Sequence, residues 1–188
     1  MKMRKIGSLL IILCVWLSGV AVAATEEPVK IVINQQYVTC DIPPRIQNGR
    51  TLVPLRPVFE ALGCDVYWQG ESLPIIIVKN DTKLLLWTDN VMLYQYTGTD
   101  IERFQQQILN GYGNNIIQYQ LDVPPQLVAD RTMVPVRTLC EVLGMTVSWD
   151  EANQTVWLTC DESILQQPNQ DTQFAIQAYE FFQGVDNL

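Results

Sequence analysis

Two arginines are the charged residues whose predicted positions are most unusual. Arg56 and Arg137 lie 81 positions apart, and the sequence around each predicts that it falls in the first turn of a short helix. The positive end of the helix dipole disfavours a cation there, so each arginine needs a specific acceptor. The candidate acceptors are Glu60 and Asp41 in the first case and Glu141 and Asp122 in the second. An internal tether needs no outside partner and is the favoured interpretation; binding of an acidic ligand is the alternative.

Aromatic side chains are the second group of residues that could bind a ligand. Trp68 and Trp149 offer flat surfaces on which sugars could stack, but each ends an alternating apolar run, which favours closure of the core at a strand end. The other aromatic residues gather in or near residues 97–114, where a ligand surface peculiar to this protein would be placed. Ordinary packing is the simpler interpretation. These residues are Trp87, Tyr94, Tyr96, Tyr112 and Tyr119.

Catalytic chemistry finds little support in the sequence. It contains no histidine, which excludes Ser-His-Asp and Cys-His catalysis and histidine metal sites. Four carboxylates flank expected turns without forming a motif: Asp65, Glu71, Asp150 and Glu151. Turn carboxylates of this kind are usually solvated, so we predict no catalytic residue, no cofactor site and no metal site.

The arginines, their candidate acceptors and the two tryptophans belong to a sequence that occurs twice. Residues 41–68 and 122–149 align without a gap and are identical at 13 of 28 positions. Such a duplication predicts two similar structural modules. The identical pairs that define the motif include Asp41/Asp122, Pro43/Pro124, Pro44/Pro125, Arg56/Arg137, Glu60/Glu141, Gly63/Gly144 and Trp68/Trp149.

Apolar spacing predicts one helix in each copy. Residues 54–62 and 135–143 each start at a proline, carry an apolar stripe at helical spacing and end before a glycine that can cap the helix. Apolar runs around them predict strands. The expected strands are residues 29–38, 51–53, 64–68, 75–78, 83–88, 91–96, 116–121, 131–134, 145–149 and 155–159.

The motif D-(I/V)-P-P, followed by R-T-(L/M)-V-P-(L/V)-R, E-x-L-G and V-x-W, resembles the copper amine oxidase N-terminal-like domain, often called a stalk domain. The resemblance covers residues 29–160 apart from an insert at 97–114. It implies an α+β fold of two repeated units, at 29–96 and 115–160, each a small antiparallel sheet curled around one helix. It also implies a non-catalytic stalk, because amine oxidase chemistry resides in a separate C-terminal domain that has no counterpart in this sequence.

Two segments lie outside the repeat, and both are predicted to form amphipathic helices that dock on the body. Loops on a duplicated scaffold often carry function, so we predict a partner surface on the insert at 97–114 and expect that a short turn could replace it. This candidate surface consists of Ile101, Phe104, Ile108, Leu109 and Tyr112. Residues 161–188 are expected to supply a polar linker and a C-terminal helix.

The first 23 residues have the form of a secretory signal peptide, with a basic start, an apolar run over residues 6–20 and the small-residue pattern Ala21-Val22-Ala23. Removal of Lys2, Arg4 and Lys5 with this segment leaves nine basic against 20 acidic residues, a net charge of −11. Such a chain should avoid nucleic acid, and no membrane span is expected after cleavage.

Four cysteines follow the expected cleavage point. None of them pairs with a cysteine at the same position of the other copy, and three stand where the other copy has an apolar residue. We therefore expect buried free thiols, with disulfides as the alternative. The four are Cys40, Cys64, Cys140 and Cys160.

These features predict a secreted bacterial protein that acts without catalysis in binding, scaffolding or spacing at the cell surface or in the cell wall. Its expected partner is a cell-wall polymer or an envelope protein. Two alternatives are a secreted hydrolase that uses carboxylates alone, and an accessory or inhibitory subunit that docks on a larger envelope protein.

Overall fold

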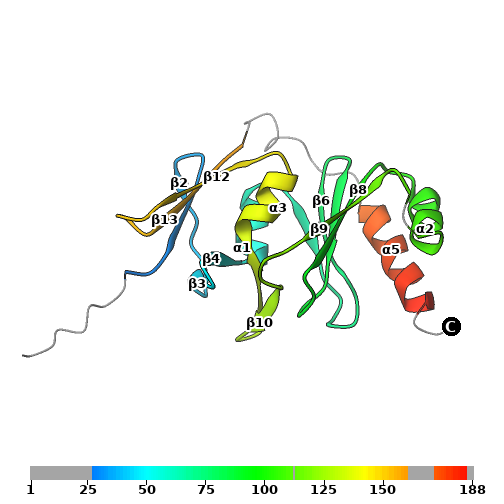
Figure 1. Cartoon of the computed structure of the whole chain (residues 1–188), viewed down its shortest axis with the longest axis horizontal. Helices are drawn as coiled ribbons and strands as arrows, with labels where there is room; N and C mark the ends of the chain where they lie inside the picture. The colour runs from blue at the N-terminus through cyan, green and yellow to red at the C-terminus, as the bar shows by residue number, and fades with distance from the viewer. Residues whose placement is uncertain (1–26, 112, 161–171, 186–188) are drawn as a thin grey trace, which may run out of the picture.

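The computed structural model describes residues 27–111, 113–160 and 172–185. Across the view of Figure 1 a sheet lies on the left, a pair of helices with a second sheet lies in the middle, and a third sheet is followed by a second pair of helices on the right. This architecture confirms the predicted α+β class. The expected signal peptide, Tyr112 and the linker at 161–171 lie outside the described residues.

The axial sheet joins the two copies of the repeat. It has the order β10-β11-β4-β3 and is antiparallel throughout. Strands β4 and β11 pair with Val53 opposite Val134, which occupy the same position of the two copies, so the ladder is symmetric about this pair. The bounds are β3 (Arg45–Gln47), β4 (Arg50–Pro54), β10 (Gln126–Val128) and β11 (Arg131–Pro135).

A short helix follows each central strand of the axial sheet, as the sequence predicts. These helices are α1 (Leu55–Ala61) and α3 (Val136–Val142), and each begins directly after a proline. Gly63 and Gly144 follow the helix ends with φ of 70° and 77°, a left-handed conformation that suits glycine. Phe59 and Cys140 occupy equivalent positions and are both fully buried.

The other two sheets do not follow the boundaries of the repeats. The terminal sheet has the order β12-β13-β1-β2, and the large sheet has the order β5-β6-β7-β8-β9. Strand β1, which precedes the first motif, pairs in parallel with β13, which follows the second. The bounds are β1 (Lys30–Ile33), β2 (Gln36–Tyr37), β5 (Asp65–Tyr67), β6 (Ile75–Lys79), β7 (Thr82–Leu86), β8 (Met92–Thr97), β9 (Ile116–Gln120), β12 (Thr146–Asp150) and β13 (Thr155–Thr159).

The expectation that each copy folds its own antiparallel sheet is therefore corrected. The strands before each motif complete the sheet formed by the strands after the other motif, and one of these pairings is parallel. Parallel neighbours need a long connection, and here the connection is most of the chain. The single strand expected at 29–38 is also divided, because Asn34 and Gln35 have positive φ and turn the chain between β1 and β2.

The large sheet is buried on both faces. Alternate residues of β6 face opposite ways: Ile75 and Ile77 belong to the main core with α1 and α3, whereas Ile76 and Val78 belong to a second core. This second core lies under α2 (Ile101–Leu109) and α5 (Thr172–Val185), which stand side by side at the right of Figure 1.

Helix α2, which carries the described residues of the predicted partner surface, packs against the second core. Phe104 on α2 is fully buried, and Ile101 and Ile108 pack partly buried against the same core. Leu109 is 66% exposed, the most exposed of the four described residues of the predicted surface. An amphipathic helix presents the same sequence pattern whether its apolar face meets a partner or its own sheet, so the pattern could not separate these cases.

Candidate functional site

Two ion pairs connect the copies reciprocally. Arg50 Nε lies 2.5 Å from Asp122 Oδ2, and at the equivalent positions Arg131 Nε lies 2.6 Å from Asp41 Oδ2. The hydrogen bond from Arg131 lowers the pKa of the Asp41 carboxyl below its ordinary value. The two aspartates predicted as acceptors for Arg56 and Arg137 thus accept from other arginines instead. Sequence reasoning missed this role of Arg50 and Arg131, although both are identical in the two copies.

Each ion pair lies in the wall of a groove, and the two grooves are built from equivalent positions. The first groove has a volume of about 600 Å³ and the second about 240 Å³. Both combine a proline, an arginine and a tryptophan of one copy with the Arg-Thr pair of the other. The first groove includes Asp41, Pro54, Arg56, Glu60, Trp68, Asp130, Arg131 and Thr132; the second includes Gly49, Arg50, Thr51, Asp122, Pro135, Arg137, Ser148 and Trp149.

In the first groove the central arginine is held internally. Arg56 Nη1 donates to Glu60 Oε1 at 3.1 Å and to the carbonyl oxygen of Val66 at 3.2 Å. The predicted tether is therefore present in this copy. It joins helix α1 to β5, since Val66 is the middle residue of that strand.

In the second groove the equivalent arginine is not held. The side chain of Arg137 is exposed, and within the described part of the chain it forms no ion pair or hydrogen bond. Glu141 has the same sequence relation to it as Glu60 has to Arg56, yet Glu141 does not line the groove. The predicted tether is thus absent in this copy among the described residues.

The two grooves consequently differ in charge. The first is lined by two arginines and three carboxylates, a balance of −1, and the second by two arginines and one carboxylate, a balance of +1. Part of the difference comes from the turn beside the groove, where Asp130 in one copy corresponds to Gly49 in the other. A local positive balance stands out in a chain with a net charge of −8.

Both tryptophans line a groove, and Trp149 also packs against the main core. Trp149 is half-buried, packs against the main core and lines the second groove. Trp68 is 37% exposed and lines the first groove. Of the Pro-Pro pairs, Pro44 and Pro125 are buried, whereas Pro43 is exposed and Pro124 half-buried.

A further pocket and an aromatic row lie away from the repeat motif. The pocket, of about 520 Å³, is lined by Trp87, Tyr94, Ile108 and Phe182 among others, so part of the aromatic group near the insert does border a cavity. The row lies on the terminal sheet, where Trp157 and Tyr37 flank Val32 on neighbouring strands and are 39% and 73% exposed. Trp157 and Tyr37 lie outside the repeat motif, and no pattern in the sequence marks them.

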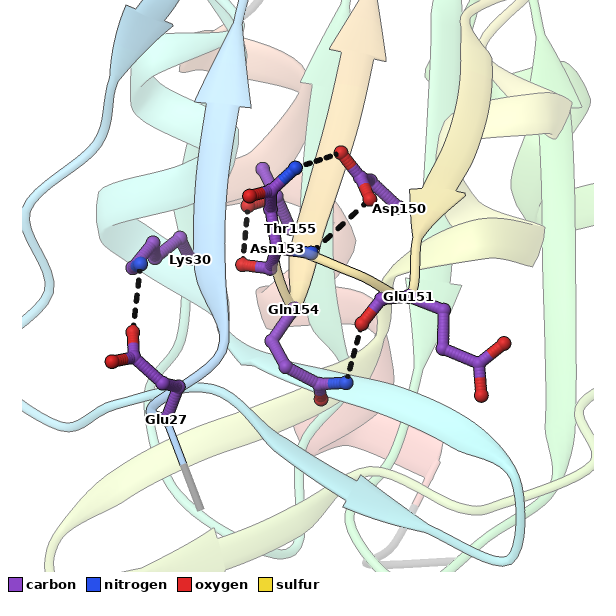
Figure 2. A network of polar contacts seen from close by, with 7 residues as sticks. All are labelled: Glu27, Lys30, Asp150, Glu151, Asn153, Gln154 and Thr155. Atoms are coloured by element: carbon purple, nitrogen blue, oxygen red, sulfur yellow. Dashed lines mark hydrogen bonds and ion pairs between the residues drawn. The ribbon is translucent and has the colours of Figure 1, made fainter. Parts of the chain in front are cut away.

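The turn between β12 and β13 shows how its carboxylates are used (Figure 2). Asp150 accepts hydrogen bonds from the backbone N–H of Asn153 at 3.2 Å and from its side-chain amide at 2.7 Å. These bonds lower the pKa of the Asp150 carboxyl. Glu151 accepts from Gln154 through its backbone carbonyl, and its carboxylate points away from that network in Figure 2. A carboxyl with a lowered pKa suits a turn acceptor and not a general acid.

Fold and grooves define a duplicated α+β module whose copies exchange strands and share their ion pairs. The chain belongs to the copper amine oxidase N-terminal domain family, whose profile matches residues 32–158 and again residues 108–180. That domain is a non-catalytic, stalk-like module. Neither the curated proteins nor the solved structures that were compared with this chain gave a significant match.

None of the helices described is long and apolar enough to cross a membrane. No cluster of three or more cysteine, aspartate or glutamate side chains suited to a metal ion occurs in residues 27–111, 113–160 and 172–185.

Proposed function

We propose that this protein is an exported, non-catalytic module that binds or spaces components of the bacterial cell envelope. The observation that carries the proposal is family membership over residues 32–158, because the copper amine oxidase N-terminal domain is itself a non-catalytic stalk-like module. The signal-peptide pattern of residues 1–23 supports export. The acidic net charge supports a soluble role away from nucleic acid.

The exchange of strands between the copies suits a spacer or scaffold. Strand β1 near one end of the described chain is hydrogen-bonded to β13 near the other end, and the axial sheet joins the copies between them. Separation of the two copies would break these pairings, the pairing of β8 with β9 and both reciprocal ion pairs. The module should therefore resist being pulled apart as two independent units.

Fractionation of cells tests the proposal directly. The full-length protein should reach the envelope or the medium, whereas a variant without residues 2–23 should stay in the cytoplasm. Purified protein should cosediment with cell walls from the producing bacterium, with an unrelated acidic protein of similar size as control. Retention of the full-length protein in the cytoplasm would contradict export. Failure to sediment with walls or to capture an envelope component would contradict the binding role.

A further inference from the structure

Arg137 in the second groove has no ion-pair or hydrogen-bond partner among the described residues, and the half-buried Trp149 lines the same groove. We propose that this groove binds a saccharide that carries a carboxylate, with Arg137 receiving the carboxylate and Trp149 supporting the sugar ring. The inference deepens the proposed envelope-binding function and rests on it.

Charge argues for an anionic ligand. Asp122, the acidic residue of the groove lining, is already paired with Arg50 at 2.5 Å, so its charge is compensated within the wall. Arg137 has no ion-pair partner among the described residues, which leaves one positive charge for a ligand. An arginine can bind a carboxylate through two parallel hydrogen bonds, which are among the stronger ones that proteins form.

Size and lining argue for a single ring of a sugar. The volume of about 240 Å³ falls below the roughly 300–1,000 Å³ typical of sites for drug-sized ligands. Trp149 supplies a planar apolar surface, while Thr51, Thr138 and Ser148 supply hydroxyl groups that can exchange hydrogen bonds with a polyol. An exposed arginine, hydroxyls and an aromatic surface together match a ring with an apolar face, a polar edge and one negative charge.

The first groove provides a natural comparison. It holds the same types of arginine and tryptophan, but Arg56 is engaged by Glu60 and by the carbonyl of Val66. Asp130 adds a further carboxylate there, where the second groove has Gly49. Arg56 acts as an internal tether in that groove, so it is not part of the proposed binding machinery.

One substitution, Gly49→Asp, can give the second groove the carboxylate that Asp130 supplies in the first. Gly49 has φ of 71° and Asp130 has φ of 60°, so aspartate already adopts the required backbone conformation at the equivalent position. A Cβ atom built at Gly49 meets no other atom within 4 Å. Gly49→Asp should therefore fold and place a carboxylate in the second groove.

The experiment is a calorimetric titration of the purified protein with trisaccharides of galacturonic acid and of glucuronic acid. The methyl esters of the same sugars serve as uncharged controls. The protein should bind at least one acidic form more tightly than its ester. Arg137→Gln and Gly49→Asp should each weaken binding of the acidic form by about tenfold or more, the equivalent of one charge-assisted hydrogen bond. Arg56→Gln should change the affinity by less than about twofold, because an exposed ion pair outside the site contributes little.

Thermal unfolding of each variant verifies that the fold is retained. Equal affinity for acid and ester, unchanged binding by the Arg137→Gln protein, or an equal loss in the Arg56→Gln protein would overturn the inference. Binding of peptides through their free C-terminal carboxylate, without binding of either sugar, would overturn the assignment to saccharides. A protein that sediments with cell walls but binds neither trisaccharide would refute this inference while leaving the proposed function intact.

Discussion

Truncation of Phe104 tests whether the insert is core. The side chain is fully buried between the large sheet and helix α5. Its ring centroid lies 5.1 Å from that of Tyr96, 5.3 Å from that of Phe174 and 6.2 Å from that of Phe182. Phe104→Ala removes the buried ring and these contacts, whereas the helix around it can remain.

The cost can be worked from these contacts. Burial of a phenylalanine side chain contributes about 1.5–3 kcal/mol. Each aromatic pair adds about 0.5–1.5 kcal/mol, and the two closest pairs therefore add about 2 kcal/mol. The total of about 4 kcal/mol agrees with the 3–5 kcal/mol typical of Phe→Ala in cores. Because small domains are stable by about 5–15 kcal/mol, the variant should fold but be much less stable.

Leu109→Ala on the same helix is the matched control. Leu109 is 66% exposed, so its truncation should change the free energy of unfolding by about 0.5 kcal/mol or less. Urea denaturation, followed by far-ultraviolet circular dichroism, measures both variants against the unaltered protein. If the two variants differ by less than about 1 kcal/mol, helix α2 is not a core element and the reasoning fails. For the same reason, replacement of residues 97–114 by a short turn should now unfold or strongly destabilise the protein.

Three further outcomes are expected. Arg131→Gln should raise the pKa of Asp41 toward its ordinary value in a carboxyl NMR titration. Because this pKa is lowered in the folded protein, the stability that the pair contributes is present above the pKa of the unfolded chain. It is lost as the pH falls through the pKa of the folded protein. An unshifted Asp41 would mean that the pair does not form in solution. Burial raises the pKa of the Cys64 thiol to about 12 and also raises the pKa of the Cys140 thiol. Both thiols should therefore react with thiol reagents only on unfolding, whereas half-buried Cys40 should react first. A native mass two or four units below that of the reduced protein would instead reveal disulfides. The purified protein should retain no stoichiometric copper after dialysis and release no peroxide from amines, since the sequence has no histidine; retained copper with peroxide release would contradict this.

The repeat and its helices were predictable from the sequence because they depend on local patterns. Proline, apolar residues at helical spacing and a following glycine mark the start, the buried face and the end of α1 and α3 within the local sequence. The motif also sufficed to identify the family. Expectations about export and envelope location rest on residues outside the described structure and stay predictions.

Strand exchange was not predictable, because the choice of a distant strand partner leaves no local pattern. The alternation of β1 is satisfied equally by any sheet with a matching buried face, and only the assembled chain shows that its partner is β13. Lys83 gives another case: it is fully buried, donates to the carbonyl of Gly98 at 2.7 Å and lies 5.1 Å from the ring centroid of Phe174. Its acceptor and that ring come from separate parts of the chain.

For the candidate site, too, some features were predictable from the sequence and others only from the tertiary structure. The sequence determined that Arg56 and Arg137 are equivalent, with a glutamate four residues after each, and so gave both the same expected role. Tertiary structure decided that Arg56 forms its tether and that Arg137 does not, within the described residues. The physical reason is that a side chain settles among all the groups that reach it, and each groove adds unlike residues of the opposite copy, such as Asp130 in the first and Gly49 in the second. Identical motifs in unlike surroundings thus produce one tethered arginine and one available arginine.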